Sequence, residues 1–483
     1  MNREFLLNII LLVLINLLIK PLFIFGIDLG VQNQLGEQYG LYFALLNLTY
    51  LSQIINDFGI QNFNNRHISQ HPYLLPKYFP NLLAIKGVLA LFYVSVTLLI
   101  AWFWLGYEAA VIPLLLVLLF NQVLAQLILF LRTNISGLGH YRTDSLLSSL
   151  DKLLMLVTCG AIIWFHVVPL SLMSFALAQT LALACSVLVV LLVMRKLAAF
   201  DFHPSWVVKW REGRAAIYSI FKQSLPYALT ILLMFAYSRM DGVLLERIAG
   251  AAHADVYASG YRLLDACNMF GYLFATLLLP MFARMLKRKD NLEPLINLSF
   301  NLIWAGSITL SAAVFFARKE LLTWMMPLRI SEYRFEVLGL LIWAFVPVSV
   351  IYIFSTLLTA GQRLMKMNRF FVLGIGLDLI LNLILIPKWQ ATGSALAAIS
   401  TQVFISGAIV WLAFREFKLT FYPARLAAVI GFALFVIFGD YVLFGQSGIS
   451  IGIKLVGAMF FGAIGLLIFR LINIRNLRKA LSY

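Results

Sequence analysis

Long apolar runs alternate with short polar gaps along the whole chain. A helix rises 1.5 Å per residue, so a run of about 20 apolar residues can cross the roughly 30 Å of hydrocarbon in a bilayer. Windows of that length predict about fourteen membrane-spanning helices. Their approximate bounds are 5–29, 38–64, 79–105, 109–132, 146–166, 170–194, 219–248, 255–283, 294–318, 337–360, 369–386, 392–414, 420–443 and 449–472. The pattern therefore predicts an all-α integral membrane protein.

The basic residues fall mostly into every second gap between these runs. Lys86 and Lys152, near the start of their approximate spans, are counted with the basic segments on one side, and Arg334 is counted with a segment on the other. The positive-inside rule places the more basic gaps in the cytoplasm, which predicts that both termini are cytoplasmic. This assignment leaves four basic residues to the spans themselves: Lys20, Arg239, Arg262 and Lys454.

Composition supports a membrane protein and argues against a nucleic-acid partner. With 62% hydrophobic and 12% charged residues, the chain has more apolar surface than one soluble core can bury. The formal net charge of +16 is spread over short gaps, without a basic domain or the aromatic-and-basic pattern that is typical of RNA binding. We interpret this charge as a topology signal with affinity for anionic membrane lipids.

The gap between the sixth and seventh spans divides the chain into comparable halves. Weak self-similarity relates these halves at an offset of roughly 216 to 227 residues. We therefore expect an N-terminal lobe at 1–194, a cytoplasmic linker at 195–218, a C-terminal lobe at 219–414, and two further spans with a cytoplasmic tail at 415–483. Two pseudo-symmetric six-helix lobes are typical of transporters.

The sequence offers no motif for bond chemistry. It contains no phosphate-binding GxxxxGK[ST] loop, no GxSxG nucleophile elbow and no HExxH zinc motif. Cys159, Cys185 and Cys267 all lie in predicted spans, where cysteine is usually a small packing residue. We expect no catalytic residue, no metal site and no cofactor.

Three segments resemble one family of membrane transporters. They are LGEQYGLYFALLNLTYLSQIINDFGIQNFNNR from Leu35, YSRMDGVLLERIAG from Tyr237 and LNLILIPKWQATGSALAAISTQ from Leu381. All three resemble motifs of the polysaccharide-transporter branch of the multidrug, oligosaccharidyl-lipid and polysaccharide exporter superfamily. The third departs from the family pattern where Gln390 and Ser394 replace small residues. The resemblance implies a flippase for undecaprenyl-diphosphate-linked oligosaccharide in the bacterial inner membrane, serving O-antigen, capsule or exopolysaccharide synthesis.

Polar residues that share a helix face inside the predicted spans are candidates for a substrate cavity, because lipid-facing polar groups are costly. The candidates are Lys20 in the first span; Asn47, Tyr50, Gln53 and Asp57 in the second; Asn121, Gln122 and Gln126 in the fourth; Arg239 in the seventh; and Arg262, Asp265 and Asn268 in the eighth. Arg239 and Arg262 suit a diphosphate, since arginine offers bidentate donors. The alternative is a closed charge network with nearby carboxylates such as Asp265 and Asp241.

Asp57, Asp151 and Asp378 are candidates either for coupling to a proton or sodium gradient or for structural ion pairs. The expected partners are the lipid-linked oligosaccharide, membrane lipids, and polysaccharide polymerase and chain-length machinery. A drug or toxin exporter of the same superfamily is the alternative function, because its fold also has duplicated lobes. A membrane glycosyltransferase or polymerase is a third possibility, which the lack of a large external loop disfavours.

Overall fold

A computed structural model describes residues 18–19, 21–61, 64, 68, 73, 75–197, 210–420, 423–446 and 448–471. Every regular element within these ranges is a helix, which confirms the all-α prediction. Eleven helices of the described residues are long and apolar enough to cross a membrane. The protein is therefore an all-helical, multi-pass membrane protein. The first predicted span, 5–29, lies mostly outside the described residues.

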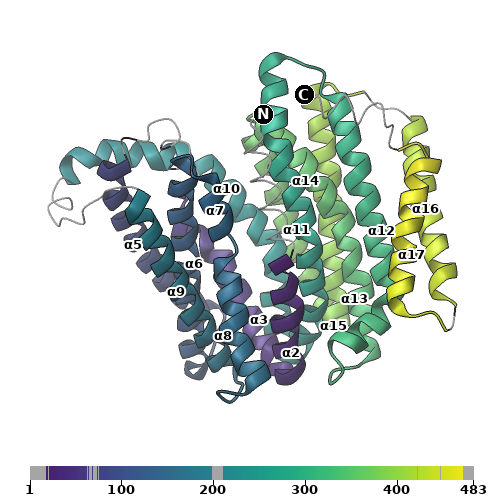
Figure 1. Cartoon of the computed structure of the whole chain (residues 1–483), viewed down its shortest axis with the longest axis horizontal. Helices are drawn as coiled ribbons and strands as arrows, with labels where there is room; N and C mark the ends of the chain where they lie inside the picture. Colours follow the sequence, from purple (N-terminus) through teal and green to yellow (C-terminus); the bar gives the residue numbers. More distant parts are fainter. Residues whose placement is uncertain are drawn as a thin grey trace. The chain divides into compact units, whose positions relative to one another are not determined.

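The chain forms two compact units, Met1–Arg247 and Ile248–Tyr483. In the first unit, α6 packs against α9 and α3, α8 packs against α9, and α5 packs against α3 (Figure 1). Its elements are η1 (Ile24–Asp28), α2 (Leu29–Leu35), α3 (Glu37–Asp57), α5 (Leu75–Leu99), η3 (Ile100–Trp104), η4 (Ala109–Val111), α6 (Ile112–Gly137), α7 (Tyr141–Leu147), α8 (Leu150–Phe165), α9 (Leu172–Leu197) and most of α10 (Trp210–Ala249). The lobe and linker boundaries expected from the sequence remain predictions.

Helix α3 differs from its neighbours in composition. With 21 residues it is long enough to cross a membrane, yet it is not among the eleven apolar helices. Its polar side chains lower its mean hydropathy, and many of them are buried within the first unit. A polar helix surrounded by apolar ones places polar groups in the interior, away from lipid.

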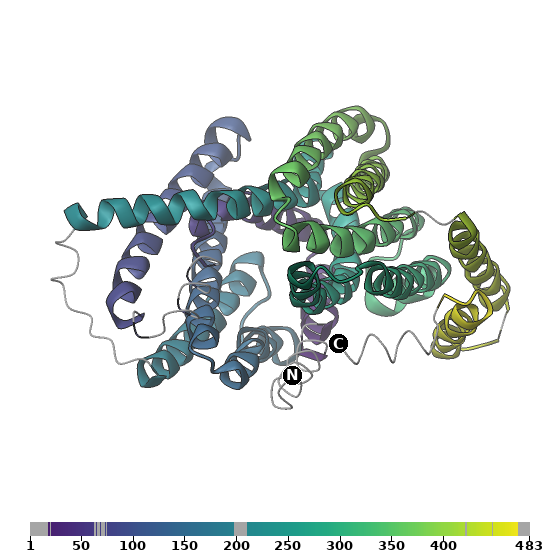
Figure 2. The ribbon, with the colours of Figure 1, turned by 90° about the horizontal axis from the view of Figure 1, so that it is seen from above.

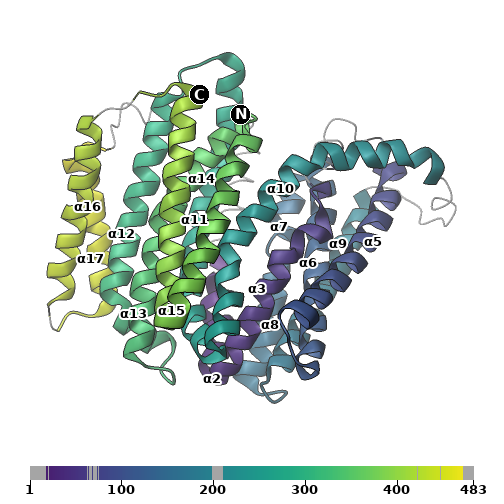
Figure 3. The same ribbon diagram turned by 180° about the vertical axis from the view of Figure 1, so that it is seen from behind.

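In the second unit, α11 packs against α14 and α13, α14 packs against α15, and α12 packs against α14, α16 and α17. The elements of this unit are α11 (Ala251–Arg288), α12 (Glu293–Met325), α13 (Glu332–Leu341), η6 (Ile342–Ala344), α14 (Phe345–Ala360), α15 (Leu364–Phe417), α16 (Pro423–Phe444) and α17 (Ile451–Ile468). The last two helices lie side by side (Figures 2 and 3).

Helix α15 is a hairpin of two helices that reverses at Gln390, whose φ of 46° and ψ of −122° are not helical. Thr401 contacts Asp378, and Ser394 contacts Asn382, so residue numbers rise on one side as they fall on the other. This hairpin contains both spans predicted at 369–386 and 392–414. A Cβ atom at Gly393 would overlap the backbone carbonyl of Leu385, so only glycine allows the two halves to approach so closely there.

Candidate functional site

The polar face predicted on α3 meets α10 within the first unit. Asn47 is 2% exposed, and its side-chain amide lies directly against Gly242 of α10. One turn further along α3, the Tyr50 ring stacks on Phe235 of α10, with the ring centroids 6.2 Å apart and the planes inclined by 11°. Because Gly242 has no side chain, α10 can approach α3 closely at this face.

Arg239 of α10 lies over the ring of Tyr50. The guanidinium carbon is 5.1 Å from the ring centroid, within the range of a cation–π interaction. The sequence identified both residues separately as cavity candidates, and the structure brings them together. The aromatic face positions the cation between two helices, and aromatic faces also pack against sugar rings.

Lys152 of α8 adds a second cation beside Tyr50. Its Nζ lies 3.6 Å from Asp151 Oδ2 and 5.1 Å from the centroid of the Phe23 ring. Tyr50 and Asp28 are also near enough to interact with it electrostatically. Asp28 is 4% exposed and ends the π-helical turn η1, a type of turn that is frequent at functional sites.

We name these five residues the Tyr50 cluster: Asp28, Tyr50, Asp151, Lys152 and Arg239. The cluster draws on η1, α3, α8 and α10 and contains two cations and two carboxylates. Sequence reasoning missed Lys152, which it assigned to a cytoplasmic gap, and it missed Asp28. Lys152 and Asp28 both fall inside predicted spans, at 146–166 and 5–29, so a charge near the end of a predicted span is the signal that could have identified them.

Other polar candidates of the first unit hold helices together. Asp57 Oδ1 accepts a hydrogen bond from Lys86 Nζ at 2.7 Å, and this buried ion pair joins α3 to α5. The Asn121 side-chain amide donates to the carbonyl of Ala176 at 3.0 Å and accepts from the hydroxyl of Thr180 at 2.7 Å, joining α6 to α9. Asp57 thus has the structural ion pair that the sequence left open as an alternative.

The remaining candidates of the first unit are Gln53, Gln122 and Gln126. Gln122 and Gln126 of α6 are each 8% exposed and lie in the interior. Gln53 of α3 has a buried Oε1 without a hydrogen-bond partner among the described residues. Lys20 lies outside the described residues.

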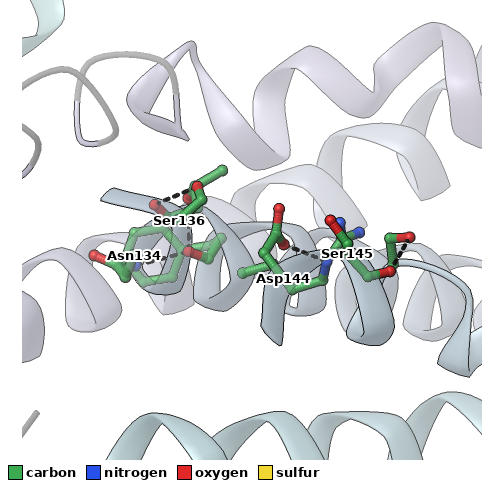
Figure 4. Close-up of polar contacts among 8 residues, drawn as sticks. Asn134, Ser136, Asp144 and Ser145 are labelled. Carbon is green, nitrogen blue, oxygen red and sulfur yellow. Dashed lines mark hydrogen bonds and ion pairs between the residues drawn. The ribbon is translucent and has the colours of Figure 1, made fainter. Parts of the chain in front are cut away.

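The turn between α6 and α7 is fixed by local polar contacts (Figure 4). Arg132 Nε donates to Asp144 Oδ1 at 2.8 Å across the turn. Within α6, the Asn134 side chain donates to the carbonyl of Phe130 at 2.7 Å and the Ser136 hydroxyl to that of Thr133 at 3.2 Å. These contacts join groups near the turn, and Asn134 Oδ1 also accepts a hydrogen bond from Asn64 Nδ2 at 2.7 Å, so we assign this segment a structural role.

In the second unit, Arg262 and Asp265 form an ion pair along α11. Arg262 Nη1 lies 3.9 Å from Asp265 Oδ2, and the two side chains are 8% and 20% exposed. Asn268, one turn further on, is partly buried. The separation of 3.9 Å is long for an ion pair.

A tighter charge pair of the second unit joins α13 to α11. Arg334 Nη2 lies 2.7 Å from Asp255 Oδ2, and both side chains are at most 5% exposed. The sequence assigned Arg334 to an external gap and did not identify this pair. Both partners are fully desolvated, so removing either one would leave a buried charge.

Asp378 lies inside the α15 hairpin and is fully buried. Thr401 Oγ1 donates to Asp378 Oδ1 at 3.2 Å, and Ser394 Oγ donates to Asn382 Oδ1 at 3.1 Å. Hydroxyl and amide groups therefore connect the two halves of the hairpin. Ser394, a departure from the family motif, takes part directly in this network.

Comparisons with solved structures show which folds the chain resembles. It is similar to the lipid II flippase MurJ in an inward closed conformation, with a TM-score of 0.73 and 13% identity over 99% of this chain and 100% of that one. It is also similar to an inward-facing multidrug resistance MATE family transporter, with a TM-score of 0.59 and 13% identity over 81% of this chain and 94% of that one.

The Vibrio cholerae MATE transporter VcmN in its bent form has a TM-score of 0.54 and 14% identity over 85% of this chain and 94% of that one. These likenesses show the fold, which is that of MurJ and MATE transporters of the MOP superfamily. No curated protein matches the chain significantly. The family model described as polysaccharide biosynthesis protein matches residues 5–286, more than half of the sequence. The chain belongs to the polysaccharide biosynthesis protein family.

Proposed function

We propose that the protein is a flippase that moves an undecaprenyl-diphosphate-linked oligosaccharide across the bacterial inner membrane. The cargo would be a repeat unit of O-antigen, capsule or exopolysaccharide. Family membership and the transporter fold shared with the MurJ flippase support a transporter of lipid-linked sugars. The lipid tail stays in the bilayer during transfer, so the protein has to shield only the polar headgroup.

The arrangement of the Tyr50 cluster is the main structural support for this proposal. A diphosphate with its sugars would lose hydrogen bonds worth several kcal/mol each in bare hydrocarbon. Arg239, held over the Tyr50 ring, and Lys152 beside it offer cations to a diphosphate, while the ring offers a surface to a sugar. The carboxylates of Asp28 and Asp151 offset the positive charge of Arg239 and Lys152. The cluster can therefore bind an anionic cargo and still release it.

The architecture we propose for this function has fourteen spans, arranged as two six-helix lobes and a C-terminal pair. Both termini and the linker at 195–218 lie in the cytoplasm, and the lobes alternate in opening to each face of the membrane. Arg239 in the first unit and Arg262 in the second are each proposed as a contact for the diphosphate. Coupling to a proton or sodium gradient uses Asp151 or Asp378. The exported repeat units pass to polysaccharide polymerase and chain-length machinery.

Substitution of Arg239 tests the cargo site. Arg239→Gln removes the cation, whereas Arg239→Lys keeps the positive charge but loses the bidentate hydrogen-bond donors of the guanidinium group. We expect Arg239→Gln to abolish glycan export, with lipid-linked oligosaccharide accumulating on the cytoplasmic face, and Arg239→Lys to retain partial export. Arg284→Gln, at an exposed position near the end of α11, is the matched control and should export normally. Wild-type export by Arg239→Gln at normal membrane abundance would contradict the proposal.

Arg262 needs a paired test because it lies beside Asp265. If Arg262 only neutralises that carboxylate, the double change Arg262→Gln with Asp265→Asn should restore both abundance and export. If Arg262 binds cargo, the double variant should reach normal abundance and still fail to export glycan. The second outcome is the one we expect.

A drug or toxin exporter is the second candidate function, favoured by the carboxylates of the cluster and by the fold shared with MATE transporters. Cationic drugs would be bound by Asp28 and Asp151 and repelled by Arg239. Under this alternative, Arg239→Gln removes the repulsion and should increase drug resistance in cells that express the protein. We expect no change in drug resistance from either Arg239 variant.

A further inference from the structure

Helix α16 carries a carboxyl group with an unusual environment for a charged residue. Asp440 is 0% exposed, and neither of its two carboxylate oxygens has a hydrogen-bond partner among the described residues. Buried carboxylates normally accept several hydrogen bonds or pair with a cation. Asp440 lies far from the Tyr50 cluster along the chain, and the proposed flippase function does not use it.

The position of Asp440 on its helix explains why it is buried. Val429, Phe432, Val436 and Asp440 follow one another at intervals of three or four residues and so share one face of α16. The first three belong to a hydrophobic core formed with α12, through residues such as Ile308 and Ala312. Asp440 therefore extends an apolar stripe that packs against α12.

An aromatic layer covers the next turn of this face. Phe444 follows Asp440 by four residues, and its ring stacks on Phe316 of α12, with centroids 6.3 Å apart and planes inclined by 21°. The same Phe316 ring meets Tyr441 edge-on at 6.2 Å. The carboxyl group thus lies between the turn of Val436 and an aromatic layer at the end of the helix.

Helix α17 adds one cation and otherwise small residues. Its buried positions are Lys454, Ala458, Gly462 and Gly465. Lys454 Nζ donates to the backbone carbonyl of Phe444 at 3.0 Å, so this ammonium group caps the end of α16 and does not bond to Asp440.

The charged groups of α12 are engaged elsewhere or exposed. Arg318 donates to the carbonyl of Phe315 and lies over that ring, and Lys319 pairs with Glu332 of α13. Glu320 is exposed, and Glu293 at the other end of α12 bonds to Thr420. No cation of the helices that pack on α16 therefore neutralises Asp440 in the part of the chain that the structure describes.

We propose that Asp440 is a proton-binding site: its carboxyl group holds a proton while α16 is packed against α12 and α17, and it ionises only when that packing opens. An unpaired carboxylate in this apolar layer would be so unfavourable that the group takes up a proton instead. An ionisable residue inside a membrane domain generally marks a functional site. Protonation at this position couples the packing of the C-terminal pair to pH.

Infrared difference spectroscopy tests the proton directly. We expect purified protein at neutral pH to show a protonated-carboxyl C=O band that is lost in Asp440→Asn, whose amide resembles the neutral acid in size. Glu332→Gln, at an exposed ionised carboxylate, is the matched control and should remove no such band. Identical protonated-carboxyl bands in wild type and Asp440→Asn would overturn the proposal. If Asp440→Asn folds poorly, Asp440→Leu replaces it in the same comparison.

Hydrogen exchange tests the coupling to packing. As pH rises, exchange of the α16 backbone should accelerate more in wild type than in Asp440→Asn, after correction for the intrinsic pH dependence of exchange. At acidic pH the two proteins should exchange alike, because both side chains are then neutral. Equal exchange in α16 at every pH would overturn the coupling, whatever the export activity of either protein.

Discussion

The backbone N–H of Ala391 donates to the hydroxyl of Tyr333 at 2.8 Å. Ala391 directly follows the reversal at Gln390, where the first N–H groups of the second half of α15 have no partner within their own helix. His253 Nδ1 lies 3.2 Å from the same hydroxyl. Tyr333 thus connects α11, α13 and the hairpin through one oxygen atom.

Tyr333→Phe should destabilise the second unit by about 1 kcal/mol, since a helix-capping bond is lost and a partly buried N–H is left unpaired. Thermal unfolding in detergent measures the change. Tyr441→Phe removes a hydroxyl from a side chain that is 65% exposed, and it should leave stability unchanged. Equal unfolding temperatures for wild type and Tyr333→Phe would show that the cap contributes nothing.

Gln390→Gly should stabilise the protein by about 1 kcal/mol or more, because a non-glycine residue at such a backbone conformation is strained by roughly 1–3 kcal/mol. The φ of 46° with ψ of −122° is readily adopted only by glycine. The control is Lys388→Gly, two residues earlier in the regular helix, which should lower stability. A decrease in unfolding temperature with Gln390→Gly would mean that the Gln390 side chain contributes more than the strain removes.

Gly242→Ala should separate α10 from the polar face of α3. The added Cβ atom would lie 2.7 Å from Phe43 Cε1 and would overlap the Asn47 amide. Overpacking of this kind typically costs 1–3 kcal/mol, and we expect reduced glycan export as Arg239 moves from Tyr50. Gly306→Ala in α12 is the matched control, since no atom lies within 4 Å of its added Cβ. It should be neutral or slightly stabilising, whereas equal effects of the two substitutions would contradict the prediction.

Because of Tyr107, the stability of the folded protein should depend on pH in the alkaline range. It lies between two candidate spans, and its hydroxyl donates to Glu246 Oε2 at 2.7 Å. Burial, followed by the charge of Glu246, raises the pKa of Tyr107 above its ordinary value. Above roughly pH 10, the unfolded chain releases this proton while the folded protein keeps it, so the contribution to stability falls.

Tyr107→Phe isolates this effect. At neutral pH the variant should be less stable by about 1–3 kcal/mol, because a hydrogen bond to a charged group is lost. Between about pH 9 and 11, wild-type stability should decline more steeply than that of the variant. Unfolding temperatures measured across this range check the prediction, and parallel curves would exclude a role for Tyr107.

The sequence predicted the elements that depend on local patterns. Apolar runs predicted the helices, and the helical period placed Asn47 and Tyr50 on one face of α3. The spacing of Arg262 and Asp265 indicated their ion pair, because residues three apart are neighbours on a helix. The gap between the spans predicted at 369–386 and 392–414 located the reversal of α15. Its departure from the family pattern at Gln390 falls where the backbone adopts a conformation that favours glycine.

The partners of isolated charges were decided by tertiary structure. The alternation of basic gaps assigned Lys86 and Arg334 to loops, yet each is buried against a carboxylate of another helix, 29 and 79 residues away in the chain. A positive-inside pattern depends only on where a charge falls along the sequence. Whether that charge is solvated or paired depends on which helix packs beside it, and the energy of a charge depends on its surroundings in space. For the same reason the sequence alone showed the cations Arg239 and Lys152, whereas only the packing of α3, α8 and α10 placed both of them beside Tyr50.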